Sequence, residues 1–227
     1  MVAVGGLAAP AAAAGRTCTE RISVTATGKL DDGRSSAPSL SADGRVVAFA
    51  YQATTFGPDS VKYRPQVFWK DLRRGALARV SGRDVSARTD TCADEGALSA
   101  DGRHLAFEYV SYRDEVRQGR PDPIAFVYVR DLRSGRNVKA NVGLDDGYGI
   151  VSARPSLTAD GRYVAFVTDD TPWYPFPVPG EVRIYVTDFT EGVPRRVIAP
   201  PGYWAGDAAD SKLSGAGRFL ACRLYVS

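Results

Sequence analysis

The stretch SADGRVVAF, at Ser41–Phe49, decides the fold because it returns three times along the chain. It reads SADGRHLAF at Ser99–Phe107, TADGRYVAF at Thr158–Phe166 and, in a degraded form, SGAGRFLAC at Ser214–Cys222. The glycines of successive copies lie 58, 59 and 56 residues apart, at Gly44, Gly102, Gly161 and Gly217. A fixed spacing of this size is typical of an architecture built from one repeated supersecondary unit.

Each copy predicts a β-hairpin. Asp-Gly is the dipeptide that best supplies the positive φ angles of a tight primed turn. After the turn, Val47, Phe49 and Tyr51 alternate with Val46, Ala48 and Ala50, which is the period of a strand. Short strands ending at Leu40, Leu98, Leu157 and Leu213 precede the turns. The repeated aspartates are therefore interpreted as turn formers, at Asp43, Asp101 and Asp160.

A second phrase follows each of the first three copies and predicts two more strands. It reads QVFWKDLRRG at Gln66–Gly75, FVYVRDLRSG at Phe126–Gly135 and RIYVTDFTEG at Arg183–Gly192. A short strand follows each of its turns, at Leu77–Val80, Asn137–Ala140 and Pro194–Ile198. Each unit is then a meander of four short strands. The predicted units lie near 38–82, 97–142 and 155–199, with a partial unit at 211–227.

A lone meander of this kind cannot bury both of its apolar faces. Copies stacked around a common axis can do so, which predicts a β-propeller. A flat β-sandwich is the alternative, although it would not require nearly identical units at equal spacing.

The hairpin phrase, followed about thirty residues later by Val-Tyr-Val-Arg-Asp-Leu at Val127–Leu132, resembles the WD-like β-propeller repeats typified by the periplasmic protein TolB. The resemblance covers nearly the whole stretch from Arg21 to Ser227. It implies an all-β propeller, or an open partial propeller, of about four blades. It leaves the activity open, because one fold serves many functions.

The composition excludes some partners. The 29 basic and 26 acidic residues give a net charge of +3, which predicts neither a nucleic acid nor an anionic membrane as partner. The apolar run Val2–Ala14 is too short to span a bilayer. It fits the apolar region of a secretory signal with an Ala-x-Ala-like cleavage site around Ala12–Ala14. We therefore expect an exported protein, periplasmic or extracellular, of a bacterial cell envelope. The alternative for residues 1–15 is a disordered tail.

The segments at the two ends of the repeat region decide whether the blades can close into a ring. Arg21–Ala26 (RISVTA) matches the fourth strand of a unit and could complete the last blade. The third strand of that blade has no counterpart, so we expect either a fragment or an open arc. Exposed sheet edges of an open arc would favour self-association.

The loops differ between the two ends of the blades. Tight Asp-Gly and Arg-Ser-Gly turns lie at one end, and long connections at the other, such as Ala53–Arg64, Ser111–Pro123 and Asp169–Gly180. Rigid scaffolds concentrate binding residues in loops, so this long-loop face is the expected binding face for a protein or cell-envelope glycan. Its aromatic candidates, stiffened by prolines, are Trp173, Tyr174 and Phe176. The alternative is a loop that folds back over a blade.

Acidic pairs in GKLDDG and GLDDGYG are candidate calcium ligands, at Asp31, Asp32, Asp145 and Asp146. Carboxylate oxygens suit calcium, although the spacing matches no defined calcium loop and solvated turns are the alternative. No other cofactor is expected.

The sequence predicts no catalytic residue. The one histidine, His104, takes a variable strand position that Val46, Tyr163 and Phe219 occupy in the other copies. No Gly-x-Ser-x-Gly elbow and no phosphate-binding loop occur.

Cys222 replaces the strand phenylalanine and is expected to be buried. Cys18 and Cys92 are the one disulfide pair considered.

Three functions follow from these features. The leading hypothesis is a non-enzymatic exported scaffold. The second is the propeller portion of a larger hydrolase or peptidase whose catalytic domain lies outside this chain. The third is a calcium-dependent structural module.

Overall fold

The protein is described here from a computed structural model. The described residues are 3–5, 19–24, 28, 33–52, 65–80, 91–112, 123–142, 151–169, 182–189, 194–197 and 207–225. All regular elements within these residues are β-strands.

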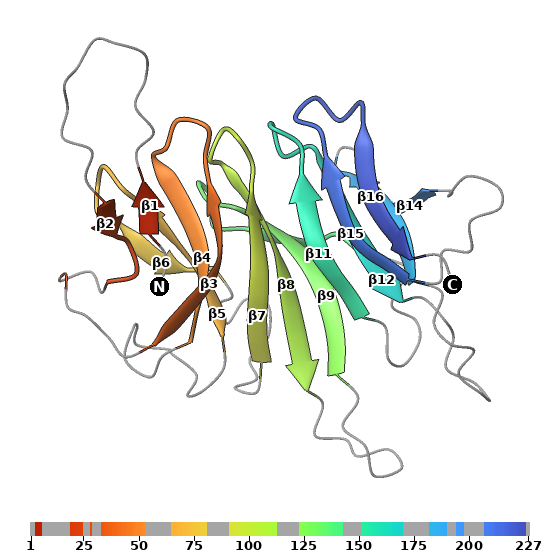
Figure 1. Ribbon diagram of the computed structural model, residues 1–227, viewed down its shortest axis with the longest axis horizontal. Helices are drawn as coiled ribbons and strands as arrows, with labels where there is room; N and C mark the ends of the chain where they lie inside the picture. The colour runs from red at the N-terminus through yellow and green to blue at the C-terminus, as the bar shows by residue number, and fades with distance from the viewer. Residues whose placement is uncertain are drawn as a thin grey trace.

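Three four-stranded meanders and one hairpin follow one another along the chain (Figure 1). The first meander contains β3 (Arg34–Leu40), β4 (Val46–Gln52), β5 (Gln66–Asp71) and β6 (Leu77–Arg79). The second contains β7 (Thr91–Leu98), β8 (His104–Tyr112), β9 (Pro123–Asp131) and β10 (Asn137–Lys139). The third contains β11 (Val151–Leu157), β12 (Tyr163–Asp169), β13 (Val182–Asp188) and β14 (Pro194–Val197). The hairpin consists of β15 (Asp207–Leu213) and β16 (Leu220–Tyr225).

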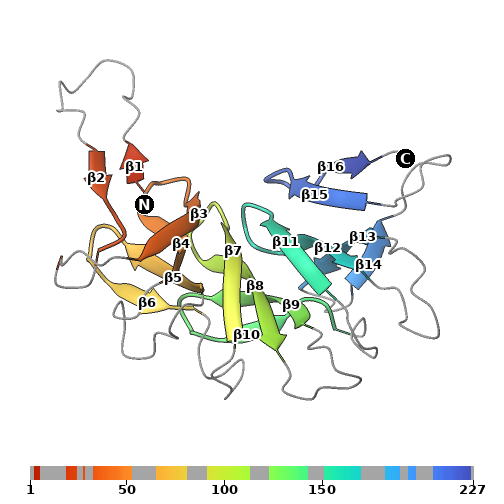
Figure 2. The same cartoon turned by 60° about the horizontal axis from the view of Figure 1, so that its bottom comes forward.

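These units are the blades of a propeller, as the sequence predicts. Within each blade, consecutive strands pair antiparallel in chain order. One parallel pair, Val151 with Ala125, links the second and third blades without interleaving their strands. The first strands of the blades lie side by side along the inner side of an open arc, as Figure 2 shows for β3, β7, β11 and β15.

The core lies between blades rather than within one blade. Val67 and Val80 of the first blade pack with Leu105 and Phe107 of the second, and all four side chains are fully buried. A second cluster joins the second blade to the third in the same way, around Phe166. Each sheet is thus covered by its neighbour, which is why both faces of the strands are apolar.

The turn of each repeated phrase differs from the primed turn that the sequence predicts. The Gly44 N–H donates to the Ser41 carbonyl at 3.0 Å, and Gly44 has a φ of 68°. Asp43 is not among the residues with positive φ. Its carboxylate instead accepts hydrogen bonds from the Ser41 hydroxyl at 2.7 Å and from the Arg45 N–H at 2.9 Å. The aspartate is therefore a turn former, as predicted, but it acts through its side chain.

An arginine–aspartate pair ties this turn to the end of the third strand. The Arg45 Nη2 lies 2.9 Å from the Asp71 Oδ2, and Arg45 Nε donates to the same oxygen. The second and third blades repeat the pair between Arg103 and Asp131 at 2.9 Å and between Arg162 and Asp188 at 2.7 Å. The hydrogen bond from Arg45, helped by two backbone N–H groups, lowers the pKa of Asp71 to about 2. These pairs hold the two tight turns of each blade together.

The turns also join neighbouring blades. The Ala42 N–H donates to the Ala100 carbonyl at 2.9 Å, and the Ala159 N–H donates to the Gly215 carbonyl at 2.8 Å. Small side chains at these equivalent positions allow the backbones to approach.

The two ends of the chain differ from the expected arrangement. The strand nearest the predicted Arg21–Ala26 segment is β2 (Thr19–Arg21), and it pairs with β1 (Ala3–Gly5). Ile22, only 2% exposed, then packs on Phe49 and Phe68 of the first blade. Figure 1 places β2 and the hairpin β15–β16 at opposite ends of the arc.

Cys222 is exposed, so the prediction that it is buried is wrong. The phenylalanines at the equivalent positions stack on an aromatic residue of the third strand of their own blade, and Phe107 and Phe166 also pack on the preceding blade. Among the described residues, no third strand covers β16.

Candidate functional site

The first strand of every blade carries a β-bulge. The pairing register shifts between Ser36 and Ser39, between Asp94 and Gly96, between Ala153 and Ser156, and between Ala208 and Asp210. The bulged strands begin several residues before the predicted units, which start near residues 38, 97, 155 and 211. An extra residue breaks the alternation of side chains, which hides the strand from a pattern with period two.

Three bulge residues have a left-handed backbone although none is glycine. The φ angles are 47° for Ala37, 47° for Glu95 and 55° for Arg154. Such a conformation costs about 1–3 kcal/mol in a residue with a side chain and is frequent at binding sites. Pro38 and Pro155 follow two of these residues, where the bulge removes the need for a ladder N–H.

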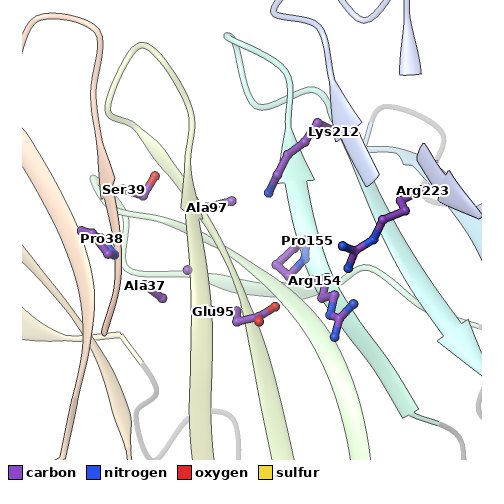
Figure 3. A pocket seen from close by; sticks show the side chains of 10 residues that line it. Ala37, Pro38, Ser39, Glu95, Ala97, Arg154, Pro155, Lys212 and Arg223 are labelled. Carbon is purple, nitrogen blue, oxygen red and sulfur yellow. The ribbon is translucent and has the colours of Figure 1, made fainter. Parts of the chain in front are cut away.

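The bulges border a pocket of about 400 Å³ at the inner side of the arc (Figure 3). All three residues with left-handed backbone line it, and so do residues of β15 and β16. Ligand pockets in proteins measure roughly 300–1,000 Å³, so this one has room for a few residues of a peptide or a small sugar.

The charged side chains at this pocket are mainly basic. Arg154, Lys212 and Arg223 come from β11, β15 and β16, and Glu95 comes from β7. Figure 3 shows these four side chains around the same space, all from exposed positions. The Ser39 hydroxyl, which also borders the pocket, accepts a hydrogen bond from the Leu98 N–H at 2.9 Å and so joins two blades. We call Glu95, Arg154, Lys212 and Arg223 the axial charge cluster.

This arrangement suits recognition of a negatively charged group. Arginine presents a planar fork that matches a carboxylate or a phosphate, and its charge persists at every physiological pH. The backbone that carries Glu95 and Arg154 is fixed by the bulges, so their side chains start from a defined position.

The binding and metal candidates named from the sequence lie outside the described residues. This holds for the aromatic candidates Trp173, Tyr174 and Phe176, and for the acidic candidates Asp31, Asp32, Asp145 and Asp146. They remain predictions. Among the described residues, no group of three or more histidine, cysteine, aspartate or glutamate side chains could hold a metal ion.

His104 lies at a contact between blades, at the tight-turn end. Its Nε2 is 3.9 Å from the Asp131 Oδ2, and its ring packs on Gly161 of the next blade. It does not line the pocket.

The sequence did not predict the axial charge cluster. Ala-Pro-Ser-Leu and Arg-Pro-Ser-Leu, at 37–40 and 154–157, were the available signal, because proline inside a strand pattern indicates a bulge or an edge.

Comparison with solved structures settles the architecture. TolB from Acinetobacter baumannii matches with a TM-score of 0.52 and 18% identity, over 86% of this chain and 38% of that chain. The fold is that of a TolB-like β-propeller. Dipeptidyl peptidase 4 from Porphyromonas gingivalis matches with a TM-score of 0.52 and 15% identity, over 86% of this chain and 29% of that chain. A prolyl endopeptidase matches with a TM-score of 0.52 and 18% identity, over 86% of this chain and 26% of that chain.

The chain therefore spans well under half the length of these proteins. No family model and no curated protein matches the sequence. At such identities the similarity establishes the fold alone. Within the described residues, no helix is long and apolar enough to cross a membrane.

Proposed function

We propose that this chain is a non-catalytic, exported β-propeller scaffold that binds a protein or glycan partner through its long-loop face, with the axial charge cluster as the anchor. The observation that carries the proposal is the convergence of three left-handed bulge residues on one basic pocket. The apolar run Val2–Ala14 supports export.

The chemistry of the pocket favours binding over catalysis. Its charged groups are arginine and lysine, which hold an anion, and one glutamate. Its hydroxyl group, Ser39, already bonds to the backbone of the next blade. We therefore expect the partner to place a carboxylate or another anionic group beside Arg154, Lys212 and Arg223.

An affinity experiment tests this proposal. Wild-type protein is used to capture partners from a bacterial envelope extract, and the captured partner is then purified and titrated. The variant Arg154→Gln/Lys212→Gln/Arg223→Gln should bind it at least tenfold more weakly, because each lost charge-assisted contact contributes about 1.5–3 kcal/mol.

A matched control removes the same charge elsewhere. Arg73, Arg133 and Arg136 are exposed residues of the turns between the third and fourth strands, do not line the pocket and lie on none of the bulged strands. The triple variant of these arginines to glutamine should bind the partner as the wild type does. Equal loss in both variants would show that net charge alone matters, and turnover by the wild-type chain would contradict a non-catalytic role.

A second function remains a proposal because peptidase structures share the fold. The chain matches segments of a prolyl endopeptidase and of dipeptidyl peptidase 4 at the same TM-score as TolB. It would then be the propeller portion of a larger hydrolase. The reading frame around this chain tests the idea, since a Gly-x-Ser-x-Gly segment there would favour the hydrolase and further repeats would favour the scaffold.

A further inference from the structure

A serine hydroxyl joins the first strands of neighbouring blades at two of the three boundaries. The Ser39 hydroxyl accepts a hydrogen bond from the Leu98 N–H at 2.9 Å, between the first and second blades. The Ser156 hydroxyl accepts one from the Leu213 N–H at 2.9 Å, between the third blade and the hairpin β15–β16. Both serines come directly before the leucine that ends their strand. We call this repeated contact the serine bond.

The boundary between the second and third blades lacks the serine bond. Ala97 takes the place of the serine before Leu98, and the backbone donor equivalent to Leu98 is Leu157. In an antiparallel strand, successive N–H groups point to opposite sides. The Thr158 N–H donates to the Tyr163 carbonyl at 3.0 Å, so the Leu157 N–H points away from β12 and toward the second blade. Among the described residues, no side-chain oxygen accepts a hydrogen bond from it.

The same boundary also differs at the tight turns. Across the boundaries before and after it, the donors are the equivalent N–H groups of Ala42 and Ala159. Between the second and third blades the equivalent residue is Ala100, but the donor is the Asp101 N–H, which reaches the Ala159 carbonyl at 3.1 Å. The missing serine therefore belongs to a boundary whose contacts are shifted relative to the other two.

The position left without a hydroxyl opens into the pocket. Ala97 lines the pocket, and Figure 3 shows its side chain pointing from β7 toward β11. Arg154, three residues before Leu157 on β11, lines the pocket as well. A backbone N–H and a guanidinium from one strand thus border the same space. Both kinds of donor form strong hydrogen bonds with an ionised oxygen, so together they suit the two oxygens of a carboxylate.

The wall of the pocket favours a peptide as the source of this carboxylate. Beside the axial charge cluster the wall is small and apolar, with Ala37, Pro38, Ala97 and Pro155. Aliphatic side chains of a peptide pack on such a wall. Sugar rings pack on the flat faces of aromatic side chains, and none of the residues that line this pocket is aromatic. Capture of a C-terminal carboxylate by backbone N–H groups is a recurring mode of peptide recognition.

We propose that the space between Ala97 and Leu157 is a subsite for the C-terminal carboxylate of a partner peptide. One carboxylate oxygen accepts from the Leu157 N–H, as the serine hydroxyl does at the other boundaries, and the Arg154 guanidinium holds the other oxygen. The proposal rests on the proposed function, because it takes the axial charge cluster as the anchor. It makes Ala97 the residue that determines specificity, since a serine there would fill the subsite with its own oxygen.

Ala97→Ser tests the proposal, because it should restore the serine bond and close the subsite. The probe is the peptide Gly-Ala-Ala-Ala, with fluorescein on its amino group and a free carboxylate, and its anisotropy reports binding. Wild-type protein should bind it, and Ala97→Ser should bind it at least about tenfold more weakly while melting no lower than the wild type. Two controls should stay within about twofold of the wild type. Ala97→Gly leaves the subsite open, and Ala78→Ser places a hydroxyl on an exposed position of β6.

The carboxylate and the backbone donor are tested separately. The same peptide with a C-terminal amide should bind at least about tenfold more weakly, because it lacks the charge. In protein with isotope-labelled leucine, NMR follows the amide of Leu157 directly. This amide should exchange with solvent faster than that of Leu98, and its signal should shift with the acid peptide but not with the amide. Exchange at Leu157 should slow in Ala97→Ser.

The outcomes distinguish this proposal from the one on which it rests. Peptide binding that is lost in Arg154→Gln/Lys212→Gln/Arg223→Gln but kept in Ala97→Ser would leave the axial charge cluster as the anchor and overturn the subsite. Equal binding of acid and amide peptides would overturn the carboxylate. Glucuronic acid that binds where the peptide does not would show a glycan partner and overturn the peptide. Absence of any peptide binding would also overturn the proposal, whereas the proposed function would still be decided by the partner captured from the envelope extract.

Discussion

Gly161 shows how a single residue sets the distance between blades. It has a φ of 72°, and a Cβ placed on it would overlap the imidazole of His104, with the His104 Cβ only 2.7 Å away. Gly215 at another blade contact has room, because its added Cβ would meet the Ala159 Cβ at 3.5 Å, an ordinary contact. A side chain is therefore excluded at Gly161 by the backbone conformation and by His104, whereas the space at Gly215 would accept a Cβ.

We predict that Gly161→Ala lowers the free energy of unfolding by about 2–4 kcal/mol, because it combines a left-handed backbone with a steric overlap. Gly215→Ala should change it by less than about 1 kcal/mol. Urea unfolding followed by tryptophan fluorescence measures both. In a His104→Ala background the cost of Gly161→Ala should fall, since the overlap is removed. Equal effects of the two glycine substitutions would show that this contact does not constrain the turn.

At the scale of the element, the arginine–aspartate pairs join two turns that are distant in sequence. The pKa of Asp131, like that of Asp71, is lowered to about 2. Burial alone would raise the pKa of Asp131, but the backbone N–H of Ser134 and the Arg103 side chain outweigh it. A carboxylate with a lowered pKa stabilises the fold above its unfolded pKa of about 4, and this stabilisation disappears as the pH falls toward 2.

We predict that the wild-type protein loses stability between about pH 5 and pH 2, and that Asp71→Asn/Asp131→Asn flattens this dependence. At pH 7 the double variant should be less stable by about 1–3 kcal/mol for each pair lost. Urea unfolding at a series of pH values checks both statements. A double variant with the same pH dependence as the wild type would mean that other carboxylates govern acid unfolding.

The elements also show how far the sequence can predict this fold. The meander was predictable because Val47, Phe49 and Tyr51 alternate with residues of the opposite strand face. The stacking of meanders was predictable because the nine-residue phrase occurs in four copies. The sequence shows a similar spacing of 26 to 28 residues for Arg45 with Asp71 and for the equivalent pairs of the other blades. It could not show the contact, since spacing does not reveal which side chains meet. The bulge at Ala37 was not predictable, because it breaks the alternation on which strand prediction depends.

The axial charge cluster could not be predicted for a different reason. Glu95, Arg154 and Lys212 belong to three separate copies and meet only because the blades curve around one axis. The exposure of Cys222 likewise depends on what covers β16, and a repeat pattern cannot show this.

At the scale of the whole molecule, each blade depends on its neighbours. Two apolar clusters join the first blade to the second and the second blade to the third, and the hydrogen bonds between turns follow the same path. Stability in such arrays is approximately the sum of nearest-neighbour contacts. The second blade packs against the first and the third, whereas the main contacts of β15 outside its own hairpin are with β11, β12 and β13 of the third blade.

We predict that amide hydrogen exchange is at least tenfold faster in β15 and β16 than in β8 and β9, because local opening needs less free energy where fewer contacts are lost. Hydrogen exchange followed by mass spectrometry measures this for each strand. Uniform protection across all blades would instead indicate that the arc unfolds as one cooperative unit.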